Sequence, residues 1–137
     1  MTVLVDTCVW SLALRRKDNQ QNNGLIEQLN QLIQQRQIVM LGVIRQEILS
    51  GIQHNEQFER IRSKLRAFPD HPVTTADFET AAQFYNHCRA KGVQGSNTDF
   101  LLCAVAHCHD LTVLTVDRDF EYFAKHIDFK LDFRPLG

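Results

Sequence analysis

The sequence lacks several features that would place it in a common functional class. No apolar stretch approaches the ~18 residues that a membrane-spanning helix needs, so we expect no membrane span in these 137 residues. No basic leader precedes the N-terminal apolar run, which predicts no signal peptide. A glycine-rich phosphate loop and a GxSxG motif are also missing. The sequence therefore gives no sign of the nucleotide-binding and serine-hydrolase classes that those motifs define.

Zinc-ligand spacings are absent as well. The four cysteines form no CxxC pair, and the six histidines show no HxxxH or HExxH spacing. We expect the cysteines to be buried, reduced thiols that act as small apolar residues, in keeping with a cytoplasmic location. They are Cys8, Cys88, Cys103 and Cys108.

A strong excess of basic charge is also missing. The chain has 15 Lys and Arg against 16 Asp and Glu, a net charge of -1. This balance argues against a protein that coats long duplexes by charge alone. It does not exclude nucleic acid, because a local basic patch or a bound metal ion can supply the positive charge.

Four carboxylates framed by apolar residues are the most informative feature that the sequence does contain. A buried carboxylate is costly unless it is paired or binds a cation. Four of them at the ends of apolar segments suggest one acidic pocket for a hard divalent cation such as Mg²⁺. Metal-assisted cleavage of a phosphodiester is the leading hypothesis. The four are Asp6, Glu47, Asp99 and Asp117.

The hydrophobic pattern alternates between short β-rich runs and segments with helical spacing. This alternation predicts an α/β domain over 1–137, with a mainly parallel sheet and helices on both faces. Asp6 and Asp117 lie just past two expected strands, where α/β sheets bind ligands, and Glu47 and Asp99 on helices could reach the same edge. The expected strands are 2–5, 38–41, 72–74, 112–116 and 129–133, and the expected helices are 8–14, 25–33, 43–50, 58–68, 75–91, 97–109 and 120–125.

Four segments in order carry a resemblance to a known family. They are Val3–Trp10 with Asp6-Thr7, Arg45–Gly51 with Glu47, Asn97–Ala106 with Asp99, and Leu114–Phe120 with Asp117-Arg118-Asp119. Together they resemble the PIN domain and, within it, the VapC-type toxins of bacterial toxin–antitoxin pairs. The resemblance covers essentially the whole chain.

The resemblance implies a three-layer α/β/α fold and an endoribonuclease that depends on Mg²⁺ or Mn²⁺. It implies a toxin that inhibits translation by cutting RNA, with tRNA among the RNAs that many members cut. A homodimer and a VapB-like antitoxin are the implied partners. By position, Asp6, Glu47 and Asp99 match the metal-binding acids. Asp117 is the favoured fourth acid and Asp119 the second candidate, while Thr7 and Thr115 match positions whose hydroxyls support the acids.

Each assignment has a structural alternative. Asp6 could cap a helix, Asp99 could stabilise a helix N-terminus, and Asp117 could be a turn residue. A PIN-fold module that binds RNA or regulates without catalysis is the alternative function. A metal-dependent phosphatase or a DNA-directed nuclease could use the same acids.

Basic and apolar residues raise two further alternatives. Arg15, Arg16, Lys17 and Arg45 could contact RNA phosphates or could simply keep the surface soluble. Apolar stripes on two expected helices could contact an antitoxin or could pack in the core. These stripes are Leu25, Leu29 and Leu32, and Ile48 and Ile52.

Overall fold

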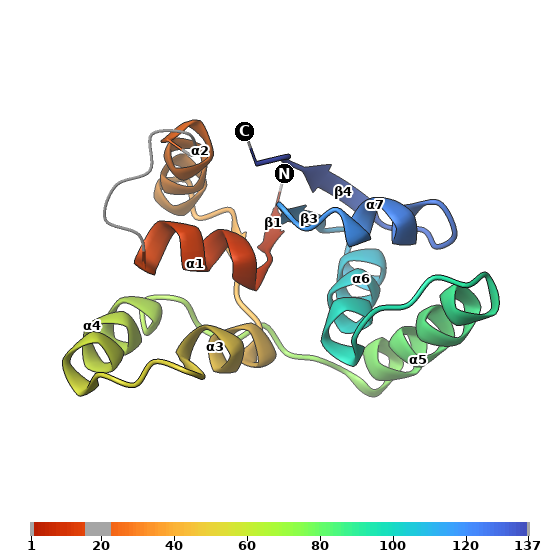
Figure 1. The fold of residues 1–137 in the computed structure, drawn as a ribbon, viewed down its shortest axis with the longest axis horizontal. Helices are drawn as coiled ribbons and strands as arrows, with labels where there is room; N and C mark the ends of the chain where they lie inside the picture. The colour runs from red at the N-terminus through yellow and green to blue at the C-terminus, as the bar shows by residue number, and fades with distance from the viewer. Residues whose placement is uncertain (1, 16–22, 137) are drawn as a thin grey trace.

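The computed structural model describes residues 2–15 and 23–136. Its centre is a parallel sheet of four strands in the order β2-β1-β3-β4 (Figure 1). The strands are β1 (Val3–Val5), β2 (Ile38–Val39), β3 (Thr112–Thr115) and β4 (Lys130–Phe133). Every residue of β1 and β3 is buried, as is usual for central parallel strands, and both strands have an apolar centre. The prediction of a mainly parallel sheet is confirmed.

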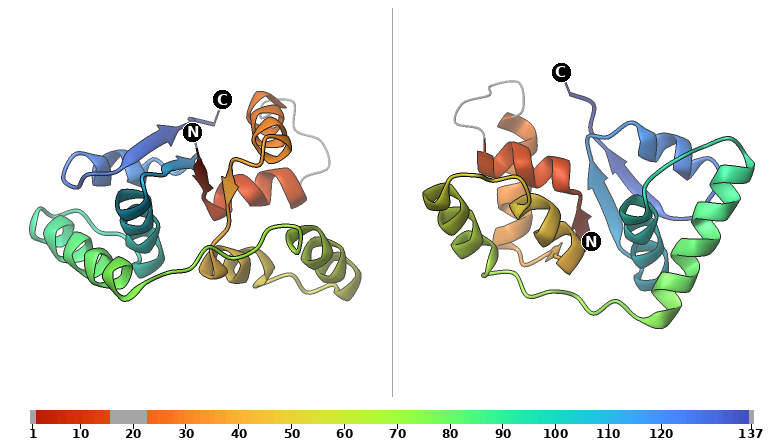
Figure 2. Two further views of the ribbon diagram at one scale, coloured as in Figure 1. Left: turned by 180° about the vertical axis from the view of Figure 1, so that it is seen from behind. Right: turned by 60° about the horizontal axis from the view of Figure 1, so that its bottom comes forward.

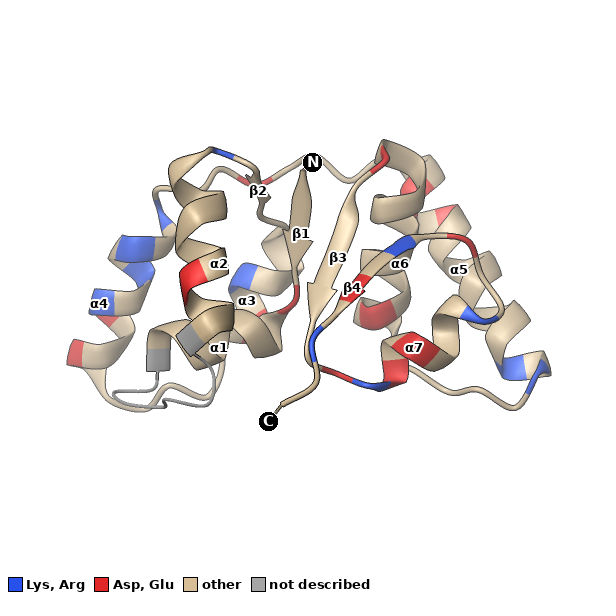
Figure 3. Cartoon of the chain, turned by 90° about the horizontal axis from the view of Figure 1, so that it is seen from above, with Lys and Arg blue, Asp and Glu red and all other residues tan. Residues whose placement is uncertain are grey.

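Helices connect the strands and cover the sheet (Figure 2). Seen from above, α1 to α4 gather beside β1 and β2, whereas α5 to α7 lie beside β3 and β4 (Figure 3). This arrangement is the expected three-layer α/β/α fold. Within the described ranges, no helix is long and apolar enough to cross a membrane. The helices are α1 (Thr7–Arg15), α2 (Asn23–Gln34), α3 (Gly42–Leu49), α4 (Asn55–Leu65), α5 (Thr75–Ala90), α6 (Asn97–His109) and α7 (Asp119–Ala124).

Helix α6 is the central helix of the core. Its residues from Phe100 to Ala106 are all buried, because the helix contacts β3 and also packs along α5. A helix that is apolar on every side needs such an enclosed position. This packing fixes the first turn of α6, which carries Asp99, relative to the ends of the strands.

Two expected strands differ from the structure. The segment 72–74 forms no strand, and the strand expected at 38–41 ends at Val39. Met40 instead makes an isolated bridge with Asp70, and the His71 amide donates to the Met40 carbonyl at 2.8 Å. Pro72 follows this contact directly and has no N–H with which to continue a ladder.

The cysteines meet the expectation of burial only in part. All four are free, and Cys88 and Cys103 are buried. Cys108 is exposed near the end of α6, so the prediction was wrong for that residue. Cys8 is half-buried and lies beside Asp6.

Candidate active site

Four segments that are far apart in the sequence bring the acids to one open cavity of about 690 Å³. Asp6 follows β1 directly, and Asp117 lies just past β3. Glu47 comes from α3, and Asp99 comes from the first turn of α6. The cavity lies at the carboxyl ends of two parallel strands, where α/β sheets usually bind ligands. It is lined by Asp6, Thr7, Cys8, Val43, Gln46, Glu47, Ser50, Thr98, Asp99 and Asp117.

The Asp6 carboxylate is held by donors on both of its oxygens. Oδ1 accepts from the Thr7 amide at 2.8 Å, and Oδ2 accepts from the Thr115 hydroxyl at 2.8 Å. The Cys8 thiol also donates to Oδ2, at 3.4 Å. Burial raises the pKa of Asp6; the bonds from Thr115, Cys8 and Thr7 lower it, the charge of Asp117 raises it, and the net shift is upward. The protein groups around Asp6 therefore only partly stabilise the negative charge of its carboxylate.

Thr115 links two of the acids. Its hydroxyl donates to Asp6 and accepts from the Asp117 amide at 3.0 Å. The Asp117 carboxylate in turn accepts from the Asp119 amide at 2.9 Å, which shapes the turn before α7. Asp119 itself is exposed and does not line the cavity. The turn thus directs Asp117, rather than Asp119, toward the other acids.

Thr7 makes a similar hydrogen bond to Glu47. Its hydroxyl donates to Glu47 Oε1 at 2.7 Å, although 40 positions separate the two residues. This bond joins the start of α1 to the exposed face of α3. The two threonines assigned by resemblance therefore each hold an acid, and the supporting role remains a prediction until it is tested.

Asp99 both caps helix α6 and lines the acidic cavity. At the start of α6 it forms a capping box with Ser96, in which each side chain accepts from the other's backbone amide. Burial raises the pKa of Asp99; the backbone bond from Ser96 lowers it, the charges of Asp6 and Asp117 raise it, and the net shift is upward. The structural alternative for Asp99 is thus real, but the cap does not remove the carboxylate from the acidic cavity.

The donor set fits a hard divalent cation. The charged ligands are all carboxylates, and the raised pKa values of Asp6 and Asp99 arise in part from repulsion between acids. Within the described residues, no three His, Cys, Asp or Glu side chains stand together as a ready-made metal cage. Mg²⁺ usually keeps several waters and is held by one or two carboxylates, so an open cavity suits it better than a cage.

Arg45 is held by protein groups, and the RNA contact considered for it stays a prediction. Its guanidinium donates to the Asp70 carboxylate at 2.9 and 3.0 Å and to the Leu65 carbonyl at 3.0 Å. It also donates to the Phe68 carbonyl. These bonds tie α3 to the end of α4 and to the segment that follows it. Arg16 and Lys17 lie outside the described residues, and of Arg15 only the backbone is described.

The two apolar stripes proposed as antitoxin contacts are mainly core. Leu29, Leu32, Ile48 and Ile52 are buried, and Leu25 is partly buried and packs against the hydrophobic core. The contact hypothesis was therefore wrong for the four buried residues, and core packing explains them. Their helical spacing is the same in either case, so the sequence could not separate the two alternatives.

Two neighbours of the acids were not assigned from the sequence. Cys8 bonds to Asp6 and lies 3.4 Å from the Thr115 hydroxyl, and Ser96 caps Asp99. Ser96 had a usable signal, because a serine three residues before an acid at a helix start is a capping box. Cys8 had only its position beside Asp6-Thr7.

Comparison with known proteins identifies the family. The PIN domain model matches residues 3–126, so the chain belongs to the PIN domain family. No curated protein matches the sequence.

Solved structures share the fold at low sequence identity. FitAcB from Neisseria gonorrhoeae aligns with a TM-score of 0.76 and 21% identity over 98% of both chains. VapBC2 from Rickettsia felis, bound to a DNA fragment from their promoter, gives a TM-score of 0.78 and 16% identity over 98% of this chain and 99% of that one. VapBC-5 from Mycobacterium tuberculosis, a member of the VapBC family of toxin–antitoxin systems, aligns with a TM-score of 0.66. The sequence identity is 18% over 98% of this chain and 99% of that one.

Proposed function

We propose that this chain is a Mg²⁺- or Mn²⁺-dependent endoribonuclease, the VapC-type toxin of a toxin–antitoxin pair. The observation that carries the proposal is the cavity in which Asp6, Glu47, Asp99 and Asp117 meet on a PIN fold. A binding module has no need of four neighbouring acids, two of which, Asp6 and Asp99, have their pKa values raised by burial and by the charges of nearby acids. A site that needs a cation for turnover explains them.

The protein residues in this mechanism bind and orient. Asp6 and Asp99 would hold the cation, with Asp117 and Glu47 completing the acidic wall. When bound, the cation supplies Lewis-acid activation of water and neutralises charge on the phosphodiester. Thr115 keeps the Asp6 carboxylate turned toward the cavity, and Thr7 does the same for Glu47. Because these supports are hydrogen bonds between distant segments, the acids are arranged before substrate arrives.

The partners follow from the same proposal. The similar structures include VapBC and FitAcB, and one belongs to a toxin–antitoxin family, so a VapB-like antitoxin is the proposed protein partner. RNA is the proposed substrate, with tRNA among the candidates, and its cleavage would inhibit translation. We place the protein in the cytoplasm as a homodimer.

A substrate panel tests the proposal. Purified protein is incubated with RNA oligonucleotides, tRNA, DNA oligonucleotides and a phosphomonoester, each with Mg²⁺, Mn²⁺ or EDTA. We expect RNA to be cut internally, only with metal, and the Asp99→Asn variant to be inactive. Cleavage of DNA alone or hydrolysis of the monoester alone would identify one of the other metal-dependent enzymes. RNA binding without any turnover in the presence of either metal would contradict the nuclease.

A further inference from the structure

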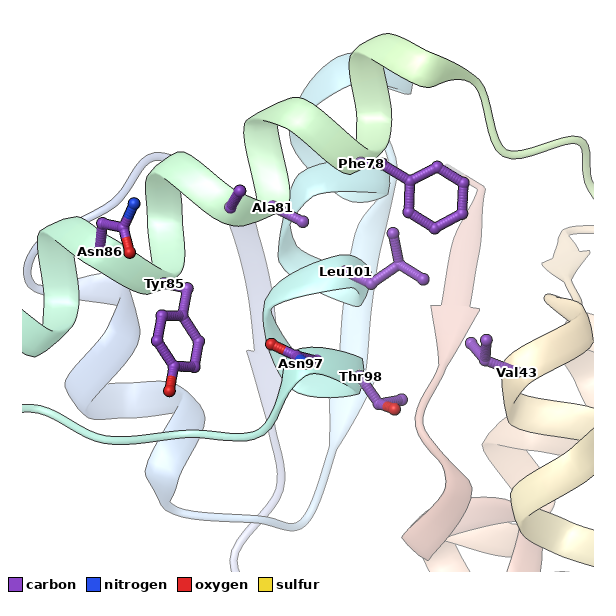
Figure 4. Close-up of a pocket in the computed structure, with 9 residues that line it drawn as sticks. Val43, Phe78, Ala81, Tyr85, Asn86, Asn97, Thr98 and Leu101 are labelled. Carbon is purple, nitrogen blue, oxygen red and sulfur yellow. The ribbon is translucent and has the colours of Figure 1, made fainter.

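The acidic cavity has no basic side chain among the described residues that line it. The adjoining cavity of about 440 Å³, over α5 and the start of α6, is lined by apolar and uncharged polar residues (Figure 4). One divalent cation balances the charge of only two carboxylates, so the phosphates beside the bond that is cut would face net negative charge. A nuclease that acts here therefore needs basic groups close to the acidic cavity.

Two arginines lie at the same edge of the sheet as the acids. Arg118 follows Asp117 directly, and Arg134 comes directly after β4. Strands β3 and β4 are parallel, Thr115 is paired with Phe133, and the Arg134 amide donates to the Thr115 carbonyl at 2.9 Å. Thr115 is the residue whose hydroxyl joins two of the acids. Figure 3 shows basic segments next to acidic ones at the carboxyl ends of β3 and β4.

Both guanidinium groups are oriented by contacts that leave donors unused. The Arg118 guanidinium lies over the Phe133 ring, 5.1 Å from the ring centroid, and donates to Glu121 at 2.9 Å. The Arg134 guanidinium donates to the two Asp132 carboxylate oxygens at 2.8 and 3.4 Å. A guanidinium carries more N–H groups than these bonds use. The arginine side chains are 62% and 47% exposed, so a ligand can reach the remaining donors.

We propose that Arg118 and Arg134 bind phosphates of the RNA strand on one side of the bond that is cut, so that the strand passes over the carboxyl end of β4. This inference rests on the proposed nuclease function and names residues that position its substrate. A guanidinium matches the geometry of a phosphate and forms paired, charge-assisted bonds to it. Phosphate contacts position a nucleic acid without reading its bases, so these arginines set where the strand lies and not which sequence is cut.

Lys130 provides the matched comparison. It is the first residue of β4, is 64% exposed and pairs with Asp110 at 2.7 Å. It therefore resembles Arg134 in charge, exposure and acidic partner, but it lies at the opposite edge of the sheet, about 13 Å away along the strand. A cation that serves only a surface ion pair should behave alike at both edges. A phosphate contact should be confined to the edge that carries the acids.

Binding of a fluorescent oligouridylate dodecamer in EDTA tests the inference without cleavage. Anisotropy at a series of salt concentrations gives the Kd of wild type, Arg118→Gln, Arg134→Gln, the double variant and Lys130→Gln. Each arginine variant should bind on the order of ten-fold more weakly at low salt. The slope of log affinity against log salt should fall by about 0.7 for each arginine and by about 1.4 in the double variant. Lys130→Gln should change neither the Kd nor the slope.

Conservative variants separate a phosphate contact from a structural role. Arg118→Lys and Arg134→Lys keep the charge and should keep the salt slope of wild type, although a lysine cannot form the paired bonds. Thermal unfolding is measured in parallel, and the two single glutamine variants carry the test if the double variant does not fold. An unchanged Kd and slope in the glutamine variants, an equal loss in Lys130→Gln, or no binding by wild type overturns the inference.

Three other results separate this inference from neighbouring ones. If wild type cuts no RNA with Mg²⁺ or Mn²⁺ but binds the oligouridylate through both arginines, the nuclease proposal fails and the phosphate contacts stand. If wild type cuts RNA and the double glutamine variant keeps its affinity and its KM, the inference fails and the nuclease stands. If that variant keeps RNA affinity but binds the proposed antitoxin more weakly, the arginines contact that protein, which also overturns the inference.

Discussion

At the scale of the single residue, the Asp6 carboxylate is surrounded by donors and still keeps a raised pKa. Thr7, Thr115 and Cys8 each donate to it, and each bond favours the anion. Burial and the charge of Asp117 act in the opposite direction and prevail. Hydrogen bonds alone therefore do not compensate this anion, whereas a divalent cation beside it would.

The first prediction concerns Asp99. Asp99→Asn should lower RNA cleavage by about 100-fold or more, as loss of one preorganised electrostatic group does. The amide oxygen can still accept from the Ser96 backbone, so the cap and the fold should survive. Initial rates with saturating Mg²⁺, together with circular dichroism, check this. Full activity in a folded variant would contradict the proposed site.

The second prediction compares the two acids of the turn before α7. Asp117→Asn should lower cleavage much more than Asp119→Asn, because only Asp117 lines the acidic cavity. Asp117→Asn also keeps an oxygen that can accept from the Asp119 amide, so the turn should persist. Parallel rate measurements on the two variants decide it. Equal or reversed losses would show that Asp119 is the functional acid.

The third prediction concerns stability without metal. Burial is the main cause that raises the pKa of Asp99 above its ordinary value. A raised pKa favours the folded state below the unfolded pKa, and that contribution is lost as pH rises through the folded pKa. In EDTA, Asp99→Asn should therefore gain stability over wild type as pH rises from about 4 to about 7.

Thermal unfolding at a series of pH values in EDTA measures this difference. Glu79→Gln, at an exposed acid on α5, is the control and should track wild type at every pH. Added Mg²⁺ should stabilise wild type more than Asp99→Asn, because a ligand that binds only the folded state stabilises it. A gap between Asp99→Asn and wild type that is constant with pH would contradict the raised pKa of Asp99.

At the scale of the element, α6 shows what local sequence can specify. The expected helix 97–109 has the observed bounds, because Ser96 and Asp99 mark its start and a continuous apolar run fills it. The helix expected from Phe58 begins at Asn55 instead. The first three residues of α4 are polar, and the N-cap residue His54 makes no side-chain hydrogen bond to the helix. Neither apolar spacing nor a capping motif therefore marked the start of this helix in the sequence. The strand expected at 72–74 failed because tertiary pairing stops beside Pro72.

The fourth prediction concerns the link between α3 and α4. Arg45→Ala should lower the free energy of unfolding by about 2 kcal/mol, since it removes charge-assisted bonds and leaves carbonyls without a donor. Arg66→Ala, at an exposed residue just past α4, is the control and should change stability little. Urea unfolding measures both. Unchanged stability with a selective loss of RNA affinity would instead support the original expectation of an RNA contact.

At the scale of the whole molecule, the meeting of the acids was partly predictable. Parallel strands end at one edge of a sheet, so Asp6 and Asp117 had to lie near each other. The bond from Thr7 to Glu47 was not predictable, because it depends on how α1 packs against α3. The same tertiary packing decided that Leu29 and Ile48 are core rather than surface. Periodicity identifies an apolar face but not what covers it.

The last prediction concerns control of the proposed nuclease by an antitoxin. The apolar stripes are mostly buried, whereas the acidic cavity is open and offers carboxylates that an inhibitory segment can recognise. A guanidinium makes strong paired bonds to carboxylates, so an arginine of the antitoxin should enter this cavity and exclude RNA. Co-expression with a VapB-like antitoxin should yield a complex and relieve toxicity.

Variants of the cavity separate this mode of inhibition from a contact elsewhere. Glu47→Gln keeps the shape of the side chain and its bond to Thr7 but removes one charge from the cavity wall. It should weaken the complex by about ten-fold, as loss of one charge-assisted pair does, whereas Arg66→Ala should not. Calorimetric titration of toxin with the antitoxin measures both. A complex of unchanged affinity in Glu47→Gln would place the inhibitory contact away from the acids, and the absence of any complex would reject antitoxin control while the nuclease chemistry remained.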